Sequence, residues 1–312
     1  MTTAGQHADS TAPAPAPAPA SNRAPAPGGT AQLAGRAVAR VGFGAMQLEH
    51  ATDRSAALAV LRQAVGAGVN HIDTAQFYSG CNALIREALS PYPDDLVLVS
   101  KVGAELNAGG RLVPGQRPEQ LRAQIEANLA ALGADRLDVV NLRRLDSAPG
   151  IVAEGDQLVD LDDQLAELAA LREEGKIGGV GLSSVSAAQV SQALPAGVAC
   201  VQNLYSVLDR TAEPVLDLCR QHGIAWVPFF PLGSRLPNWP KVTEEPAVVA
   251  VAAEVGATPA QVGLAWLLAH YDRTLLIPGT SNPAHLNENI EAGAVRLPAA
   301  LVAALGRLAT QG

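Results

Sequence analysis

The sequence is poor in cysteine, in lysine and in aromatic residues, and these shortages exclude several classes of protein. It has 3 Cys in 312 residues with no CxxC spacing, so we expect neither a disulfide framework nor a structural zinc site. The net charge of −8, without a clustered basic run, argues against a nucleic-acid partner. No apolar run reaches the roughly 18 residues that cross a bilayer. The N-terminus lacks a basic region followed by an apolar one, so we expect no secretory signal and a reducing, cytoplasmic location.

The first 36 residues are almost all Ala, Pro, Gly, Ser and Thr, with TAPAPAPAPA at 11–20 as the clearest stretch. Such a segment cannot bury apolar area, so we predict a disordered or polyproline-like tail over 1–36. The chain is 48% hydrophobic, which is ample for a large core. Residues 37–312 are therefore expected to fold as one domain, and no obligate protein partner is evident.

From about residue 38, short β-branched runs alternate with longer amphipathic patterns. Strands are expected near 40–45, 69–73, 96–101, 138–142, 178–183, 199–203, 224–229 and 274–278. Helices are expected at 56–67, 118–132, 160–174, 187–194, 213–222 and 259–270. This alternation predicts an α/β protein built as a single (β/α)8 TIM barrel. An open doubly wound sheet is the alternative, but it normally carries GxGxxG after an early strand, and this chain has none.

Polar side chains end two neighbouring strands, where a barrel of this kind places its active site. Asp73 closes the second expected strand, Tyr78 follows in the loop, and Lys101 ends the third. A free phenol has a pKa of about 10, too high for easy proton exchange at neutral pH. A nearby ammonium favours the phenolate and lowers that pKa, while a carboxylate keeps the ammonium charged and oriented. We interpret the three residues as a tuned proton donor and acceptor for a carbonyl oxygen or an alcohol.

Several segments resemble the aldo-keto reductase superfamily, in that family's order along about 38–310. They are GFGAMQ at 42–47, HIDTAQFY at 71–78, LVLVSK at 96–101, DVVNLR at 138–143, GLSS at 181–184, VQN at 201–203, FFPLG at 229–233 and IPGTSNPAHLNEN at 277–289. Five segments are similar to those of the bacterial branch that includes NADPH-dependent pyridoxal reductases: AMQL, NALIREAL, VVNLR, FFPLG and IPGTS. The loop after Tyr78 is about two residues shorter than that family's usual form.

The resemblance implies roles for four residues in catalysis. Tyr78 matches the proton-donating tyrosine, Lys101 the lysine that lowers its pKa, and Asp73 the aspartate paired to that lysine. Arg143 stands where the family usually has a His at the end of strand four. An arginine cannot lose its proton and offers a fixed fork of donors, so Arg143 could polarise a carbonyl or hold an anionic substrate group. A purely structural replacement is the alternative. Strand alternation should point Arg144 away from the site.

The resemblance also implies a bound NADPH. Ser183 and Gln202 match residues that hold the nicotinamide carboxamide, Ser184 replaces the usual Asn beside them, and Phe229 matches the aromatic residue that stacks on the ring. Leu232, Gly233 and Ser234 match the loop over the pyrophosphate. Thr280, Ser281 and His285 match contacts to the adenosine 2′-phosphate, and Glu288 and Asn289 match contacts to the adenine. Gly44, Ala45, Met46 and Gly279 complete the implied cofactor set. The family often has Lys and Arg where this chain has Gly279 and His285, which weakens the case for a strict NADPH requirement. NADPH is still favoured over NADH, because the branch with the IPGTS sequence resembles NADPH users.

These features predict an enzyme that moves a hydride from NADPH to an aldehyde or ketone while Tyr78 protonates the oxygen. Its partner would be a small carbonyl compound, pyridoxal-like among others. An NADPH-binding regulatory or sensing subunit with weak turnover is the alternative that Arg143 and Ser184 leave open. A metal-dependent barrel hydrolase would need clustered His, Asp and Glu at the strand ends, whereas these strands end in Lys, Arg, Ser, Asn and Phe, so we expect no metal.

Overall fold

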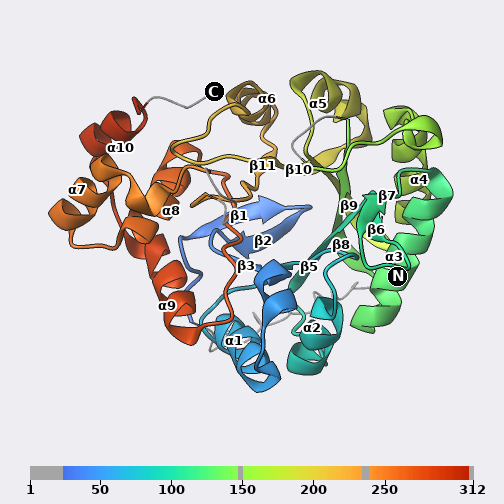
Figure 1. Cartoon of the computed structure of the whole chain (residues 1–312), viewed down its shortest axis with the longest axis horizontal. Helices are drawn as coiled ribbons and strands as arrows, with labels where there is room; N and C mark the ends of the chain where they lie inside the picture. The colour runs from blue at the N-terminus through green and yellow to red at the C-terminus, as the bar shows by residue number, and fades with distance from the viewer. Residues whose placement is uncertain (1–23, 147–149, 234–238, 309–312) are drawn as a thin grey trace, which may run out of the picture.

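The computed structural model describes residues 24–146, 150–233 and 239–308. Its main sheet has seven strands in the order β11-β10-β9-β8-β5-β4-β3, and every neighbouring pair is parallel. The strands are β3 (Phe43–Gly44), β4 (His71–Asp73), β5 (Val97–Val102), β8 (Leu137–Arg143), β9 (Ile177–Ser183), β10 (Val198–Gln202) and β11 (Ala225–Trp226). They lie at the centre of the molecule with helices around them (Figure 1). Seven of the eight predicted strands are therefore present as regular strands.

The eighth predicted strand, near 274–278, closes the cylinder without forming a regular strand of its own. Its residues make single parallel bridges to both edges of the sheet, between Thr274 and Trp226 and between Leu276 and Val41. The backbone nitrogen of Leu275 donates to Trp226 O, and that of Leu276 to Arg40 O, both at 2.8 Å. Because the two edge strands are joined through this segment, the sheet is a closed barrel as predicted.

Ten helices are found among the described residues. They are α1 (Arg54–Gly66), α2 (Cys81–Leu89), α3 (Pro118–Leu132), α4 (Leu161–Glu173), α5 (Ala187–Ala193), α6 (Glu213–His222), α7 (Pro246–Val255), α8 (Pro259–His270), α9 (Pro283–Glu291) and α10 (Ala299–Leu305). Helices α3 and α8 begin at Pro118 and Pro259, where the expected ranges 118–132 and 259–270 begin. Thr258 Oγ1 accepts from Gln261 N at 3.2 Å, and the Gln261 side chain accepts from Thr258 N at 3.0 Å, which closes a capping box.

The expected ranges did not include helices α2, α7, α9 and α10 or the hairpin that follows β5. Helices α7 and α10 pack against α8 on the outside of the barrel (Figure 1). An antiparallel hairpin of β6 (Ala104–Leu106) and β7 (Leu112–Pro114) follows β5. Of the described helices, none has by itself the length and hydropathy needed to cross a bilayer; α7 and α8 reach them only as a pair, which is bent by 90°.

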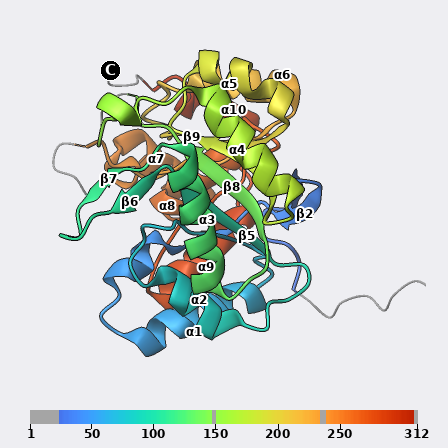
Figure 2. The ribbon, with the colours of Figure 1, turned by 90° about the vertical axis from the view of Figure 1, so that its right-hand side faces the viewer.

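The apolar side chains form two main layers. The larger layer lies between the sheet and the helices. The smaller one fills the barrel interior with residues such as Val97, Val99 and Val139, and Leu33 and Val38 join it from a second hairpin. That hairpin pairs β1 (Thr30–Leu33) with β2 (Arg36–Ala39), and it lies at the end of the molecule opposite to β6 and β7 (Figure 2).

The hairpin corrects the predicted domain boundary at residue 36. Residues 30–33 are a strand, and Leu33 is only 2% exposed, so the folded part begins before residue 37. Composition was misleading here because two buried side chains are enough to seat a short hairpin on the barrel. Residues 1–23 of the predicted tail lie outside the described residues.

Truncation of Leu33 should destabilise the barrel. We expect Leu33→Ala to lower the free energy of unfolding by about 2–5 kcal/mol, because it removes a buried side chain and leaves a cavity in the barrel interior. Urea denaturation followed by far-UV circular dichroism measures the change. Leu158→Ala is the matched control, since Leu158 is 65% exposed and its truncation should shift the value by less than about 0.5 kcal/mol. Equal effects of the two substitutions would contradict the conclusion that Leu33 is part of the barrel core.

Candidate active site

A buried ion pair joins the ends of β4 and β5. The Lys101 ammonium contacts Asp73 Oδ1, and the two side chains are 7% and 3% exposed. Lys101 Nζ also donates to the Thr74 carbonyl oxygen at 3.0 Å. Burial is the largest single effect and lowers the pKa of Lys101, but the charges and hydrogen bonds of Asp73 and Tyr78 together outweigh it, so the net pKa lies above its ordinary value. The structure therefore brings these two residues together as predicted and holds the lysine in its charged form.

Tyr78 lies beside this pair in the turn after β4. Lys101 Nζ is 5.1 Å from the centroid of the half-buried Tyr78 ring. Burial raises the pKa of the phenol, the charges of Lys101 and Arg143 lower it, and the net pKa lies above its ordinary value. The predicted lowering by Lys101 is present, but the prediction of an unusually acidic phenol is wrong because burial has the larger effect. Tyr78 thus keeps its proton at neutral pH, and two cations stabilise the phenolate that remains once the proton leaves.

Arg143 ends β8, the next strand after β5, and reaches the same site. Its guanidinium carbon lies 5.5 Å from the centroid of the Phe77 ring, and its charge is felt at the Tyr78 phenol. Arg144 points away from the site, as strand alternation predicts. It forms a bidentate pair with Asp146, with distances of 2.7 and 2.9 Å, and donates to the Val159 carbonyl at 3.0 Å. The two adjacent arginines therefore have different surroundings, and Arg143 is the one that faces the phenol.

The strands β9 and β10 end in Ser183 and Gln202, both buried. Gln202 Nε2 donates to Asp73 Oδ2 at 2.6 Å, a bond across the barrel that was not predicted from the sequence. Gln202 Oε1 is buried without a hydrogen-bond donor among the described residues. Ser184 has a positive φ of 58° and donates its backbone N–H to Gln202 O at 2.9 Å. Asparagine enters this left-handed region more readily than serine, so the departure at Ser184 carries a conformational cost.

The other predicted cofactor positions follow the remaining strand ends. Gly44 and Gly279 are in close backbone contact, because a Cβ on Gly279 would collide with the Gly44 carbonyl oxygen. Close packing of the two backbones is therefore enough to explain why both residues are glycine. Phe229 is half-buried after β11, with its ring 5.5 Å from that of Phe230. Ser234 lies outside the described residues.

The positions assigned to the adenosine end gather around α9. Thr280 is buried, and its Oγ1 accepts from Asn282 N at 3.0 Å in the turn before the helix. His285 is exposed on the first turn of α9, while Glu288 and Asn289 are half-buried further along it. The N-terminal turn of a helix can offer backbone N–H groups to an anion. In α9, Pro283 has no N–H, and Asn282 Oδ1 accepts from Ala284 N at 2.8 Å, so the backbone N–H of His285 is the next one along the helix.

The predicted site residues form two adjacent arcs at one end of the barrel. Three neighbouring strands, β4, β5 and β8, supply Asp73, Lys101 and Arg143, and the loop after β4 supplies Tyr78. The predicted cofactor positions that the structure describes follow the rest of the circle from β9 round to β3: Gly44, Ala45, Met46, Ser183, Ser184, Gln202, Phe229, Leu232, Gly233, Gly279, Thr280, Ser281, His285, Glu288 and Asn289. The bond between Gln202 and Asp73 connects the two arcs.

Two further contacts were not predicted from the sequence. The Thr74 carbonyl that anchors Lys101 is a backbone group, which no side-chain pattern reveals. Asn203 fastens the loop after β9, since its Oδ1 accepts from Val185 N at 3.1 Å and its Nδ2 donates to Val185 O at 2.7 Å. Its position directly after Gln202 was the available signal.

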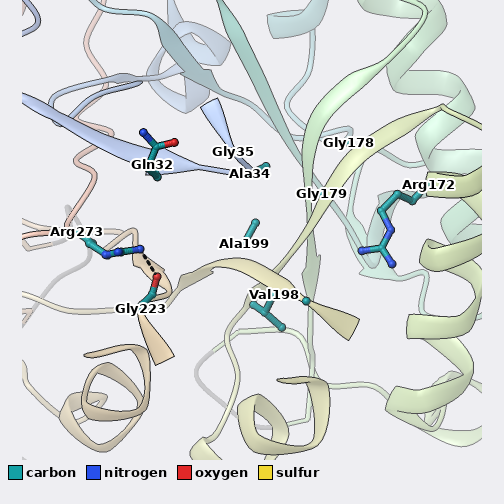
Figure 3. Close-up of a pocket in the computed structure, with 11 residues that line it drawn as sticks. Gln32, Ala34, Gly35, Arg172, Gly178, Gly179, Val198, Ala199, Gly223 and Arg273 are labelled. Carbon is teal, nitrogen blue, oxygen red and sulfur yellow. Dashed lines mark hydrogen bonds between the residues drawn. The ribbon is translucent and has the colours of Figure 1, made fainter. Parts of the chain in front are cut away.

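A separate hollow of about 300 Å³ opens at the opposite end of the barrel (Figure 3). Its lining comes from the β1–β2 turn and from the starts of β9 and β10. A Cβ on Gly179 would lie 2.9 Å from the Ala34 Cβ, so this glycine lets the hairpin turn approach. Arg172 and Arg273 stand on its rim, and Arg273 donates to the Gly223 carbonyl at 2.6 Å. Its lining contains no carboxylate, histidine or cysteine.

The chain resembles characterised oxidoreductases over most of its length. It is 42% identical over 277 residues to pyridoxine 4-dehydrogenase of Escherichia coli, which covers 86% of this chain and 94% of that protein. An aldo/keto reductase of Klebsiella pneumoniae in complex with NADP and acetate superposes with a TM-score of 0.74 and 27% identity, over 88% of this chain and 94% of that one. An aldo-keto reductase of the same organism in complex with NADPH gives 0.74 and 28%, over 88% and 93%.

The sequence profile of the aldo/keto reductase family matches residues 40–309. This span includes every strand of the parallel barrel and all four residues predicted to act in catalysis. The chain is therefore an oxidoreductase of the aldo/keto reductase family.

Proposed function

We propose that this enzyme is an NADPH-dependent carbonyl reductase that acts on small aldehydes or ketones, pyridoxal-like compounds among them, with Tyr78 as the proton donor. The observation that carries the proposal is the buried Asp73–Lys101 pair facing the Tyr78 ring at the carboxyl ends of the strands. The similarity to pyridoxine 4-dehydrogenase supports the substrate class, and the Klebsiella complexes support the cofactor.

The residues opposite Tyr78 fit a nicotinamide cofactor. The Gln202 Nε2 group is bound to Asp73, which fixes the orientation of the amide. Its Oε1 atom has no donor among the described residues and can accept from a carboxamide NH2 group. Ser183 offers a buried hydroxyl on the next strand, and Phe229 an aromatic face. The α9 N-terminus, with Thr280 and Ser281 before it, suits a phosphate group and supports NADPH over NADH.

In the proposed reaction, NADPH supplies a hydride to the carbonyl carbon when it is bound. Tyr78 donates its proton to the substrate oxygen as negative charge develops there, and this gives the alcohol. Lys101 and Arg143 stabilise the phenolate that Tyr78 becomes, so their help grows towards the transition state. Asp73 keeps Lys101 charged and oriented. In the reverse direction, the phenolate takes the proton of an alcohol.

We place the enzyme in the cytoplasm, which the three cysteines support because Cys81, Cys200 and Cys219 are all free and buried. Within the described residues, no group of three His, Cys, Asp or Glu side chains gathers as a metal-ligand set. A metal-dependent hydrolase therefore gains no support from the side-chain arrangement.

Replacing the proton donor should stop reduction and spare cofactor binding. We expect Tyr78→Phe to lower kcat for NADPH-dependent reduction of pyridoxal and benzaldehyde by about 100- to 10,000-fold, because general acid catalysis is lost. NADPH oxidation at 340 nm measures the rate, and quenching of protein fluorescence measures the dissociation constant for NADPH. Full activity of Tyr78→Phe would refute the assigned acid. Tight NADPH binding by the wild-type protein without turnover of any carbonyl would instead favour the sensing function.

Removing the charge of Lys101 should shift the pH dependence. Because Lys101 lowers the pKa of Tyr78, its loss raises that pKa further, and alcohol oxidation, which needs the phenolate, then requires higher pH. We expect the rising limb of the pH–kcat profile for oxidation to move to higher pH in the double variant Lys101→Met/Asp73→Asn. Both partners are replaced together so that no unpaired charge stays buried. Lys176→Met, on a surface ion pair with Glu126, should leave the profile in place. The Asp73 charge raises the pKa of Tyr78, but less than Lys101 lowers it, so the net change is still upward. An unchanged limb in the double variant would contradict a dominant effect of Lys101 on the phenol.

An asparagine at position 184 should suit the backbone better than serine. Because Ser184 has a positive φ, we expect Ser184→Asn to raise the free energy of unfolding by up to about 1 kcal/mol and Ser184→Val to lower it by about 1–3 kcal/mol. The added amide should also tighten NADPH binding, since it supplies donors that a hydroxyl lacks. Urea denaturation without cofactor and fluorescence titration with NADPH test the two effects separately. Weaker NADPH binding by Ser184→Asn would remove this residue from the cofactor site.

A further inference from the structure

Arg143 brings a positive charge to the Tyr78 end of the barrel that no carboxylate among the described residues balances. Its guanidinium lies over the Phe77 ring, and of the titratable groups in the described part of the chain only the Tyr78 phenol acts on its charge. Gln116 Nε2 donates to the Arg143 backbone carbonyl at 2.8 Å, which fixes the main chain. Within residues 24–146, 150–233 and 239–308, no hydrogen-bond acceptor is recorded for the Arg143 side-chain donors.

Its neighbour Arg144 shows how this fold otherwise satisfies an arginine at the same strand end. The Arg144 guanidinium has a bidentate carboxylate, Asp146, and the Val159 carbonyl, and Gln164 also accepts from it. Arg143 is half-buried and has none of these partners. A guanidinium stays protonated even where burial lowers its pKa, so Arg143 keeps a partly desolvated charge that an anion would compensate.

The other charges of the site leave the Arg143 charge uncancelled. Asp73 and Lys101 neutralise each other, and Asp73 is further held by Gln202. The Glu49 carboxylate accepts from Ser79 N at 3.2 Å and is not among the groups that act on the Arg143 charge. The phenol itself is neutral at neutral pH because its pKa is raised. The substrate side of Tyr78 therefore carries a net positive charge in a fork that matches two acceptor oxygens.

We propose that Arg143 is a specificity-determining residue that selects carbonyl substrates with an anionic oxygen, an ionised hydroxyl or a carboxylate, on the atom next to the carbonyl-bearing carbon. This inference rests on the proposed carbonyl reduction. Tyr78 takes the carbonyl oxygen while the Arg143 fork takes the neighbouring anion, so the charge orients the carbonyl for proton transfer. Pyridoxal has this pattern, since its ring hydroxyl is on the carbon next to the one that bears the aldehyde.

The experiment compares aldehydes of similar shape and different charge. The ionised ortho-hydroxyl is represented by 2-hydroxy-5-nitrobenzaldehyde, the neutral counterpart by its methyl ether, the distant anion by 4-hydroxy-3-nitrobenzaldehyde, and the carboxylate by 2-formylbenzoate. Each is assayed at neutral pH with wild-type enzyme, Arg143→Gln and Arg143→Lys. We expect Arg143→Gln to reduce the kcat/KM ratio of the ortho anion to its methyl ether by about 10- to 100-fold, as loss of a charge-assisted hydrogen bond implies. Arg143→Lys should keep part of the preference.

Controls separate this role from a general one. Arg111→Gln removes the same charge from an exposed turn of the β6–β7 hairpin and should leave all the ratios unchanged. Equal losses for charged and neutral aldehydes in Arg143→Gln would overturn the proposal and indicate that Arg143 only polarises the carbonyl. Loss of preference for 2-formylbenzoate alone would restrict the site to carboxylates, and loss for the phenolate alone to ionised hydroxyls.

Binding gives a readout that does not depend on turnover. Isothermal titration of the same compounds into enzyme saturated with NADP+ should show a tighter ortho anion for the wild-type protein and no such preference for Arg143→Gln. An absence of preference in the wild-type titration overturns the inference, whether or not the aldehydes are reduced. Reduction of neutral aldehydes without any anion preference would leave the proposed function intact and refute the role of Arg143 alone.

Discussion

The arrangement of the site depends on one buried ion pair, between Lys101 and Asp73. Removing two charges from water is costly, and the cost is met only when each charge has good partners. Here both charges have further partners. Asp73 accepts from Lys101 with one oxygen and from Gln202 with the other, and Lys101 also donates to the Thr74 carbonyl. The pair therefore fixes the position of a positive charge against the Tyr78 ring. Tyr78, the proposed proton donor, thus has a defined place relative to the residues proposed to hold the cofactor.

The closed barrel explains how residues far apart in the sequence meet at this pair. Parallel strands all present their carboxyl ends at one end of the cylinder, so β4, β5 and β10 deliver Asp73, Lys101 and Gln202 to the same depth. The apolar layer below them and the β1–β2 hairpin at the other end fill the interior. Water is thus kept from the pair by packing beneath it, while Tyr78 stays half-exposed towards the substrate side.

Much of this could be predicted from the sequence because the signals were local. The strand-to-helix alternation indicated the barrel, and the strand-ending residues Asp73, Lys101 and Arg143 indicated the site. What could not be predicted arises from competition between effects. Charge alone suggested an acidic Tyr78, but burial, which depends on the packed loop, reverses the sign. The hairpin at 30–39 was hidden by an Ala- and Gly-rich composition, and the Gln202–Asp73 bond joins strands on opposite sides of the barrel. No pattern in the sequence indicates a hydrogen bond between strands that lie so far apart along the chain.

The charge state of Lys101 is the most direct test of this account. The chain has only three lysines, so 15N-detected NMR of the side-chain amines should resolve Lys101 from the surface residues Lys176 and Lys241. The account predicts that Lys101 remains an ammonium beyond about pH 10, the ordinary lysine range, and that Asp73→Asn lowers its titration midpoint. A neutral Lys101 amine near pH 7 in the wild-type protein would contradict it.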